Sequence, residues 1–306
     1  MKKIIVTTTI NKVSSALQKF SQMPGWQLIV VGDLKTPHKE FEELDCIYLG
    51  PEAQKEKYPK LSKLLGWNCI QRRNIGFIEA YKLGAEVIAT VDDDNIPNKE
   101  WGKNLLLGKE TEVNFYSTDL ICFDPVGATN HKNLWHRGFP LQLLSKRSSA
   151  YINPEKKVFC PDVQADFWNG APDIDAVCRL EHDVCCNFEE KYFPMATNAF
   201  SPFNSQNTFI SRKALKNYFM FAHIGRMDDI WGSYYLEAAG HKVVYNQPSV
   251  CQERNPHNIS DDLANEVIGY ENNLRLLNAL SKSPERIEQF LPKKSWEAFK
   301  EYQKLF

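Results

Sequence analysis

The sequence predicts an α/β fold with a mostly parallel central sheet, because strand and helix signals alternate through its first third. Residues 3–8 and 86–91 are β-branched or apolar runs of strand length, and residues 68–84 repeat apolar side chains at three- and four-residue steps. Strands that alternate with helices form right-handed βαβ units and therefore parallel sheets. Ligands of such sheets bind beyond the carboxyl ends of the strands, so residues directly after a strand are the first candidates for a site.

The remaining elements follow from the same signals. Further strands are expected at 26–31, 46–49 and 242–245, and helices at 13–20, 211–222 and 228–239. Residues 111–198 are rich in aromatic residues, proline and cysteine, which indicates loops and short strands that recognise a specific substrate. After residue 260 the chain is charged and helical, with helices expected at 261–282, 284–290 and 295–305.

The composition excludes several classes of protein. With 37 Lys and Arg against 38 Asp and Glu, the chain lacks the basic excess of a dedicated nucleic-acid binder. The 8 cysteines form no Cys-x-x-Cys pair, which favours free thiols in a reducing compartment over a zinc or disulfide set. No apolar stretch approaches the ~18 residues of a membrane span. We therefore predict a cytoplasmic protein, and peripheral contact with a membrane surface stays open.

An acidic triplet, Asp92-Asp93-Asp94, directly follows the apolar strand at 87–91. Carboxylate oxygens are preferred ligands of hard divalent cations, and a cation here would stabilise a diphosphate leaving group. A solvated acidic turn or a helix cap is the alternative. Three adjacent acids repel one another, which an ordinary turn has no reason to tolerate, so we favour a metal site.

Two further charged pairs flank this triplet in the chain. Arg72-Arg73 begins the helix that leads into the strand, where guanidinium groups and a helix N-terminus both suit a phosphate; a solvated helix face explains them equally well. Asp228-Asp229 precedes an aromatic helix, and such carboxylates suit general-base work on a sugar hydroxyl. Either aspartate could also be the N-cap of that helix.

Weaker candidates lie in loops of the second half. His257 follows a predicted strand and is a candidate metal ligand. The segments 135–140 and 167–175 bring aromatic rings next to polar groups, as sugar sites do, although core packing uses the same aromatic residues. They contain the candidates Arg137, Trp168, Asp173 and Asp175. The sequence contains no Gly-x-Gly-x-x-Gly, Gly-Lys-Ser/Thr or Gly-x-Ser-x-Gly motif, so it indicates no dinucleotide fold, P-loop or nucleophile elbow.

Five motifs together resemble two related groups of proteins, over roughly residues 1–260 and in the same order. The groups are the reversibly glycosylated polypeptides, which are UDP-arabinopyranose mutases, and the STELLO-type glycosyltransferase-like proteins. The motifs are Val30-Val31-Gly32-Asp33-x-Lys35-Thr36-Pro37, Arg72-Arg73-Asn74-Ile75-Gly76, Val91-Asp92-Asp93-Asp94-Asn95, Arg137-Gly138-Phe139-Pro140 and Arg226-Met227-Asp228-Asp229-Ile230-Trp231.

The resemblance implies a GT-A fold, a nucleotide-sugar donor (a UDP-sugar above all) and a Mn²⁺ or Mg²⁺ ion at the Asp-x-Asp element. It places Asp92 or Asp93 at the ribose, Asp94 at the metal and Asp33 at the base or ribose; His257 matches the late metal-binding histidine only loosely. We accordingly divide the chain into a GT-A-like domain, 1–260, and a C-terminal helical extension, 261–306. The domain would comprise a nucleotide-binding half, 1–110, and an acceptor half, 111–260.

One position departs from the mutase group. Its self-glycosylated arginine lies seven residues after the Arg of the Arg-Gly-Tyr-Pro segment, which is Leu144 here, and Arg147 is out of register. The sequence therefore favours a glycosyltransferase that moves the sugar to an external glycan or lipid-linked acceptor. Nucleotide-sugar mutase activity and non-catalytic binding of nucleotide sugars remain the alternatives, and the sequence does not give the oligomeric state.

Overall fold

A computed structural model describes residues 1–151, 153–253 and 258–306. Their strands form one 11-stranded sheet with the order β3-β2-β1-β4-β10-β8-β11-β9-β6-β7, and β5 pairs with β11. The predicted α/β fold is confirmed. The strands are β1 Lys3–Thr9, β2 Gln27–Gly32, β3 Ile47–Leu49, β4 Val87–Val91, β5 Asn95–Pro97, β6 Thr111–Tyr116, β7 Glu155–Phe159, β8 Val163–Gly170, β9 Met195–Thr197, β10 Asn207–Ser211 and β11 Val243–Gln252.

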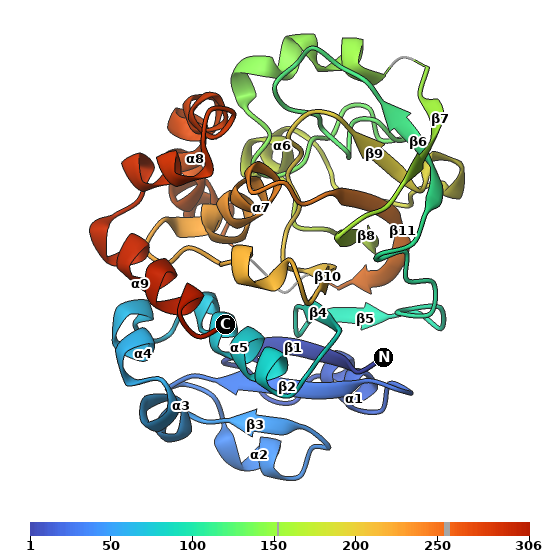
Figure 1. The fold of residues 1–306 in the computed structure, drawn as a ribbon. Coiled ribbons are helices and arrows are strands. Elements are labelled where there is room, and N and C mark those ends of the chain that lie inside the picture. The colour runs from blue at the N-terminus through green and yellow to red at the C-terminus, as the bar shows by residue number, and fades with distance from the viewer. Residues whose placement is uncertain (152, 254–257) are drawn as a thin grey trace.

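Helices cover the sheet and extend beyond it (Figure 1). The α-helices are α1 Ser15–Ser21, α2 His38–Glu42, α3 Pro51–Lys57, α4 Pro59–Leu65, α5 Arg73–Lys82, α6 Ala176–Glu181, α7 Asp228–Ala238, α8 Ile259–Leu280 and α9 Lys293–Gln303. Short 3₁₀ segments are η1 Ile70–Arg72, η2 Leu141–Tyr151, η3 Glu190–Tyr192, η4 Leu215–Asn217, η5 Gly225–Met227 and η6 Pro284–Phe290. No helix of the described segments is long and apolar enough to cross a membrane.

The N-terminal strands form the parallel part of the sheet. β3, β2, β1 and β4 are parallel neighbours, and every residue of β4 is buried. α5 packs on β1 and β2 through Gly76, where a Cβ would lie 2.4 Å from Cγ1 of Val6. A glycine at this position therefore allows the helix to approach the sheet closely enough to bury its inner face.

The strand directions determine where side chains can converge. β10 runs antiparallel to both β4 and β8, while β8 and β11 are parallel to each other. The carboxyl ends of β1, β4, β8 and β11 and the start of β10 therefore lie along one edge of the sheet. Loops at this edge carry the acidic triplet and face α7, which begins at Asp228.

The helix expected at 211–222 is wrong. Ser211 ends β10, and the rest of the segment contains only the 3₁₀ turn η4. Residues 218–222 are buried without exception, from Tyr218 to Ala222. A run that is apolar on all sides carries no helical periodicity, so tertiary packing determines its conformation. All eight cysteines are free, as the sequence predicts.

The C-terminal helices pack on the rest of the chain. α8 contacts η5, α7 and α6, and α9 contacts α4 and η4 (Figure 1). In α9 the buried residues Ser295, Ala298, Phe299 and Tyr302 lie on one side. Phe299 packs its ring on Phe219 and Phe221, so the extension completes the apolar core around residues 218–222.

Candidate active site

A cavity of about 430 Å³ opens at the edge of the sheet where β1, β4, β8 and β11 end. It combines carboxylates from three separate segments with three arginines and several amide or hydroxyl groups. Its lining consists of Thr8, Ile10, Asn11, Ile70, Gln71, Arg73, Asp92, Asp93, Asp94, Arg137, Asp173, Ser205, Gln206, Gly225, Arg226, Asp228, Asp229 and Gln252. The two acidic motifs of the sequence therefore meet in one cavity.

Arg73 links α5 to the acidic triplet. Its side chain is almost fully buried, and Nη2 lies 2.8 Å from Oδ1 of Asp92. Nη1 donates to Oγ1 of Thr90 at 3.2 Å and to the backbone oxygen of Ser205 at 3.0 Å. Burial raises the pKa of Asp92 above its usual value, and the Arg73 guanidinium opposes that shift. Arg73 therefore offsets part of the cost of burying a charge at this position of the cavity.

Asp93 and Asp94 differ in their surroundings. Asp93 Oδ2 accepts hydrogen bonds from the Thr9 hydroxyl and, at 3.1 Å, from the Asn11 side chain. Asp94 Oδ2 accepts a bond of 3.3 Å from Gln252, while its buried Oδ1 has no hydrogen-bond partner in the described part of the chain. Burial and the neighbouring Asp92 carboxylate raise the pKa of Asp94 to about 7. An orphaned buried carboxylate oxygen costs free energy unless a further ligand satisfies it.

A chain of amide groups positions Asp94 from behind. The indole of Trp168 donates to Oε1 of Gln206, and Nε2 of Gln206 donates to Oε1 of Gln252. Gln206 Nε2 also lies 3.1 Å from Oδ1 of Asn95. Because Gln206 holds Oε1 of Gln252, the side-chain amide of Gln252 has one orientation, in which its Nε2 donates to Asp94.

Asp228 and Asp229 line the same cavity and lie in the first turn of α7. Neither is the N-cap, which is Met227, so the alternative of a simple capping role is wrong. Asp229 Oδ2 accepts from the Ser205 amide at 2.8 Å, and Oδ1 lies 3.1 Å from Nη2 of Arg137. Burial opposes ionisation of Asp229, but Arg137 and these hydrogen bonds outweigh it and lower its pKa.

Asp228 has fewer partners. Its Oδ2 accepts one side-chain hydrogen bond, of 2.6 Å, from Gln71. Burial and the adjacent Asp229 charge raise the pKa of Asp228 to about 7. Two neighbouring carboxyl groups with pKa values pushed apart in this way are typical of an acid/base pair, in which the group with the raised pKa exchanges the proton.

Asp173 and Arg226 close the cavity at the side of α8. Asp173 pairs with Arg137 at 3.2 Å and also contacts Arg226, which in turn lies 3.1 Å from Asp262 and 3.0 Å from Glu266. The guanidinium groups of Arg137 and Arg226 are therefore each held between carboxylates.

Four of the predicted residues that the structure describes, Arg72, Asp175, Trp168 and Asp33, do not line this cavity. Arg72 is fully buried, donates to Gln54, Ser62 and Gly66, and stacks over Trp67 with 3.7 Å between the guanidinium carbon and the ring centroid. Neighbouring residues on a helix point about 100° apart, so Arg72 faces α4 while Arg73 faces the triplet.

Asp175 and Trp168 also lie outside the lining of the cavity, and both contact other parts of the protein. Asp175 is the N-cap of α6 and accepts from Val177 at 2.9 Å and from Cys178 at 3.2 Å. Trp168 is buried within β8 and reaches the site only through Gln206. His257, the predicted third metal ligand, lies outside the described residues.

Asp33 lines a smaller cavity of about 190 Å³ next to the main one, together with Asn11, Cys69 and Asp93. Its carboxylate accepts from the backbone amides of Leu34 at 2.7 Å and Cys69 at 3.0 Å. The residue after β2 therefore shapes a smaller compartment that adjoins the main cavity, with which it shares the lining residues Thr8, Ile10, Asn11, Ile70 and Asp93.

Sequence reasoning assigned no role to Gln71, Ser205, Gln206 or Gln252, each of which holds or lines the site. Gln252 ends β11, a position that marks it as a candidate once the strand boundary is known. Gln71 directly precedes the Arg72-Arg73 pair, and the two charges are the stronger signal for a phosphate site. Ser205 and Gln206 lie in an irregular loop before β10, where no periodic signal identifies them.

The residues present fit a divalent cation whose coordination shell is completed by oxygen atoms of the substrate. Within 1–151, 153–253 and 258–306, no group of three or more His, Cys, Asp or Glu side chains is arranged to hold a metal. Asp94 nevertheless lines the cavity beside Asp92 and has a buried oxygen with no hydrogen-bond partner among the described residues. One or two carboxylates plus substrate phosphates are the usual donor set of Mg²⁺ in nucleotide sites, so two aspartates are sufficient.

Comparison with known proteins extends these observations. No protein-family model matches the chain. Two curated relatives from Arabidopsis thaliana, Probable glycosyltransferase STELLO2 and Probable glycosyltransferase STELLO1, are 22% and 23% identical in an alignment of 266 residues that covers 79% of this chain. The chain resembles the STELLO proteins. The matched region is 35% of STELLO2 and 34% of STELLO1, so the chain spans about a third of these relatives.

Solved structures give more distant likenesses. Glucosyl-3-phosphoglycerate synthase from Mycobacterium tuberculosis, in complex with phosphoglyceric acid, has a TM-score of 0.47 at 11% identity and covers 90% of this chain and 80% of its own. The mannosyltransferase PcManGT from Pyrobaculum calidifontis, in complex with GDP-Man and Mn²⁺, has a TM-score of 0.38 at 9% identity, with coverages of 99% and 85%.

The STELLO resemblance confirms the family likeness drawn from the sequence motifs. The two residues compared with the modified arginine of the mutase group have structural contacts. Leu144 packs against the core, and Arg147 pairs with Asp124 at 2.9 Å. Neither residue lines the acidic cavity, which is the 430 Å³ cavity that contains Asp94 and Asp228.

Proposed function

We propose that the chain is a GT-A-type glycosyltransferase that moves a sugar from a nucleoside diphosphate donor to an acceptor hydroxyl, with Mn²⁺ or Mg²⁺ at the acidic triplet. The observation that carries the proposal is the unsatisfied buried oxygen of Asp94, a residue that lines the same cavity as the Asp228-Asp229 pair. A cation ligand and a candidate base in one cavity supply the two functions that sugar transfer requires.

Asp94 and Asp92 would hold the cation. When bound, it would neutralise the charge of the departing diphosphate. Arg73 pairs with Asp92, and Gln252 orients Asp94. The smaller compartment beside Asp93, shaped by Asp33, suits the nucleoside of a UDP-sugar, since it adjoins the diphosphate position without sharing it.

Asp228 is the better candidate for the base. A base works best when its pKa lies near the working pH, and that of Asp228 is raised to about 7. Asp229 is held as a carboxylate by Arg137 and Ser205 and would orient the acceptor and keep its neighbour's pKa high. In an inverting reaction Asp228 would take the proton from the acceptor hydroxyl as that oxygen attacks the anomeric carbon.

The paired charges around Arg137 and Arg226 favour a neutral acceptor. Arg137 and Arg226 are neutralised by Asp173, Asp229 and Glu266. An acceptor with a phosphate or carboxylate next to the reacting hydroxyl would meet carboxylates that already occupy these arginines. A neutral hydroxyl of a glycan, or of the sugar of a lipid-linked acceptor, avoids that repulsion.

The test is nucleoside diphosphate release from a panel of UDP-, GDP- and CDP-sugars with Mn²⁺, with and without neutral glycan acceptors. We expect one donor class to be consumed, faster with acceptor, and Asp94→Ala to abolish the reaction. Asp183→Asn, an exposed aspartate outside the cavity, is the matched control and should behave as wild type.

Three outcomes oppose the proposal. Absence of both donor binding and nucleotide release across the panel would refute it, as would an Asp94→Ala variant with wild-type turnover. A ring-contracted nucleotide sugar formed without acceptor would identify a mutase instead.

A further inference from the structure

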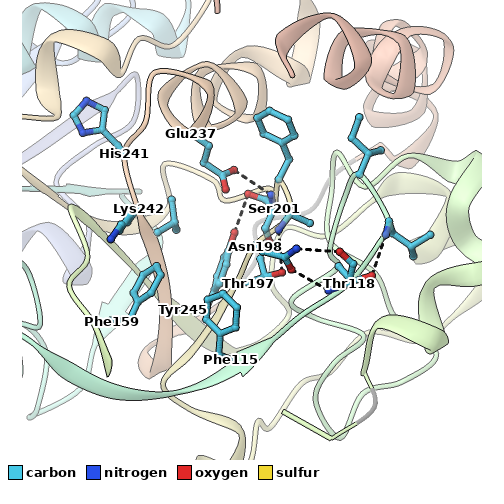
Figure 2. A pocket seen from close by; sticks show the side chains of 15 residues that line it. Phe115, Thr118, Phe159, Thr197, Asn198, Ser201, Glu237, His241, Lys242 and Tyr245 are labelled. Atoms are coloured by element: carbon cyan, nitrogen blue, oxygen red, sulfur yellow. Dashed lines mark hydrogen bonds between the residues drawn. The ribbon is translucent and has the colours of Figure 1, made fainter. Parts of the chain in front are cut away.

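A second cavity, also of about 430 Å³, lies at the opposite edge of the sheet. β6 and β9 run antiparallel to β11, so the carboxyl ends of β6 and β9 lie beside the start of β11. Figure 2 shows the cavity between these strand ends, β7 and the last turn of α7. It shares no lining residue with the acidic cavity. Its volume lies in the range of about 300–1,000 Å³ that small-molecule sites occupy.

The floor of this cavity carries polar groups that the protein does not satisfy. Ser201 is fully buried, and its Oγ has no hydrogen-bond partner within the described residues. The backbone amide of Ser201 donates to Oε1 of Glu237 at 3.0 Å, and Figure 2 shows both side chains at the base of the cavity. The second oxygen, Oε2, accepts no hydrogen bond from the segments the structure covers. Burial raises the pKa of Glu237 well above 4.5, which favours the neutral carboxyl, a donor as well as an acceptor.

Aromatic rings form the wall above these groups. Phe115 on β6 and Phe159 on β7 lie 6.1 Å apart between ring centroids, at an angle of 49°. Phe200 and Tyr245 also line the cavity, and Tyr245 uses its hydroxyl to donate to the backbone oxygens of Ser201 and Pro202. The cavity therefore combines apolar ring faces with a small set of hydrogen-bonding groups.

The other polar groups are already engaged by the protein. The side chain of Asn198 accepts from the Thr118 amide at 2.9 Å and donates to its carbonyl at 3.1 Å. His241 interacts with Asn217 and Asp162. Ser201 and Glu237 thus remain for a ligand, and Lys242 is the one ammonium group among the lining residues that the structure describes.

From this arrangement we infer that the second cavity binds a neutral sugar ring, such as one unit of a glycan chain. The C–H face of a sugar carries a small positive charge that suits the negative face of an aromatic ring, here Phe115 or Phe159. Its hydroxyls would satisfy Ser201 Oγ and the Glu237 carboxyl, which otherwise stay unpaired. A purely apolar ligand would leave both unpaired.

The inference concerns binding alone and does not depend on the transfer reaction proposed above. Saturation-transfer NMR with methyl glycosides of neutral hexoses and pentoses, without nucleotide or metal, tests it. We expect at least one glycoside to bind with a millimolar dissociation constant. Ser201→Ala should weaken that binding about fivefold, the value of one hydrogen bond, and Phe159→Ala about tenfold.

Ser295→Ala is the matched control, because Ser295 is equally buried and equally unpartnered but lies in α9 away from the cavity. It should leave the dissociation constant unchanged. Asp94→Asn should also leave it unchanged, which separates this site from the acidic cavity. If Ser201→Ala fails to fold, as judged by thermal unfolding, Phe159→Ala on the edge strand β7 decides the question.

Three results would overturn the inference. The first is no binding by any glycoside up to high millimolar concentration. The second is binding that Asp94→Asn abolishes and Phe159→Ala leaves intact, since the sugar would then occupy the acidic cavity alone. The third is binding of cyclohexanol, an apolar ring of similar size, at least as tight as that of every glycoside.

Discussion

The two cavities have the same volume but opposite chemistry. The acidic cavity contains six carboxylates and three arginines. The second cavity, lined by Phe115, Phe159 and Glu237 and here named the aromatic cavity, contains one carboxyl, one lysine and several aromatic rings. The first lies where β1, β4, β8 and β11 end, and the second where β11 begins. The difference shows how one sheet can separate charge-dependent chemistry from neutral recognition: converging loops bring charges together at one edge, while the other edge retains core-like aromatic residues.

The acidic cavity should be far more sensitive to the loss of one charge. We expect Asp228→Asn to lower the turnover number about a thousandfold, because a general base contributes roughly 10²–10⁴ in rate. The wild-type rate should rise with pH through an apparent pKa of about 7, since only deprotonated Asp228 accepts the acceptor's proton. The residual rate of the variant should lack this rise. Steady-state kinetics between pH 5.5 and 8.5, with the donor class identified above, would measure both effects.

Asp229→Asn provides the comparison for that prediction. It should also impair turnover, but it should shift the pH profile to lower values, because removing the Asp229 charge lowers the pKa of Asp228. A profile that keeps its rise near pH 7 in Asp228→Asn would assign the titrating group elsewhere.

The pairing of Arg73 with Asp92 allows a stability test of the same region. Arg73→Met leaves Asp92 without its partner in a largely buried setting, whereas Arg73→Met/Asp92→Asn removes both charges. We expect a coupling energy of about 2 kcal/mol from the double-mutant cycle, measured by urea unfolding. The neighbouring Arg72 is the control: the free energies of Arg72→Met and Asp92→Asn should add within about 0.5 kcal/mol. Additivity of the Arg73 and Asp92 substitutions would contradict the assigned pairing.

These two arginines also show what sequence could and could not predict. The alternation of strands and helices predicted the sheet and the position of the acidic triplet at a strand end, because burial of alternating elements determines both. Which of Arg72 and Arg73 faces the triplet depends on where α5 begins, and the sequence places helix ends only to within a few residues.

The aromatic cavity was not predictable for a different reason. Its walls come from β6, β7, α7, β11 and the loop before β10, and their register is set by long-range pairing. Ser201 and Glu237 lie 36 residues apart in the chain and carry no motif. The Trp168 segment shows the converse: its aromatic residues suggested a ligand site, yet they pack in β8 because a buried strand uses the same side chains.

A smaller effect is expected from the support of Asp94. Gln252→Leu removes the amide that donates to Asp94 Oδ2 and should weaken Mn²⁺ binding in the presence of UDP about tenfold, as loss of groups behind metal ligands typically does. Titration calorimetry would measure the affinity. Cys251→Ser, at the exposed neighbouring position, should retain wild-type affinity. Equal affinities for wild type and Gln252→Leu would show that Asp94 needs no such support.

The smallest effect should come from the aromatic cavity, through Glu237. Because burial raises its pKa in the folded chain, the folded state holds this proton more tightly than the unfolded state, whose glutamate titrates near ~4.3. The resulting stabilisation is fully present below that pH and is lost as the pH rises through the folded-state value. Glu237→Gln keeps the acceptor for the Ser201 amide and removes the titration, so the free energy of unfolding should lose this downward slope with pH. Since Glu237 takes no part in the proposed reaction, this effect concerns stability alone, and the difference in the free energy of unfolding between wild type and variant should fall as the pH rises from 5 to 8, measured by urea unfolding. Equal slopes for wild type and variant would mean that Glu237 is ionised in the fold, and the aromatic cavity would then share the charged character of the acidic one.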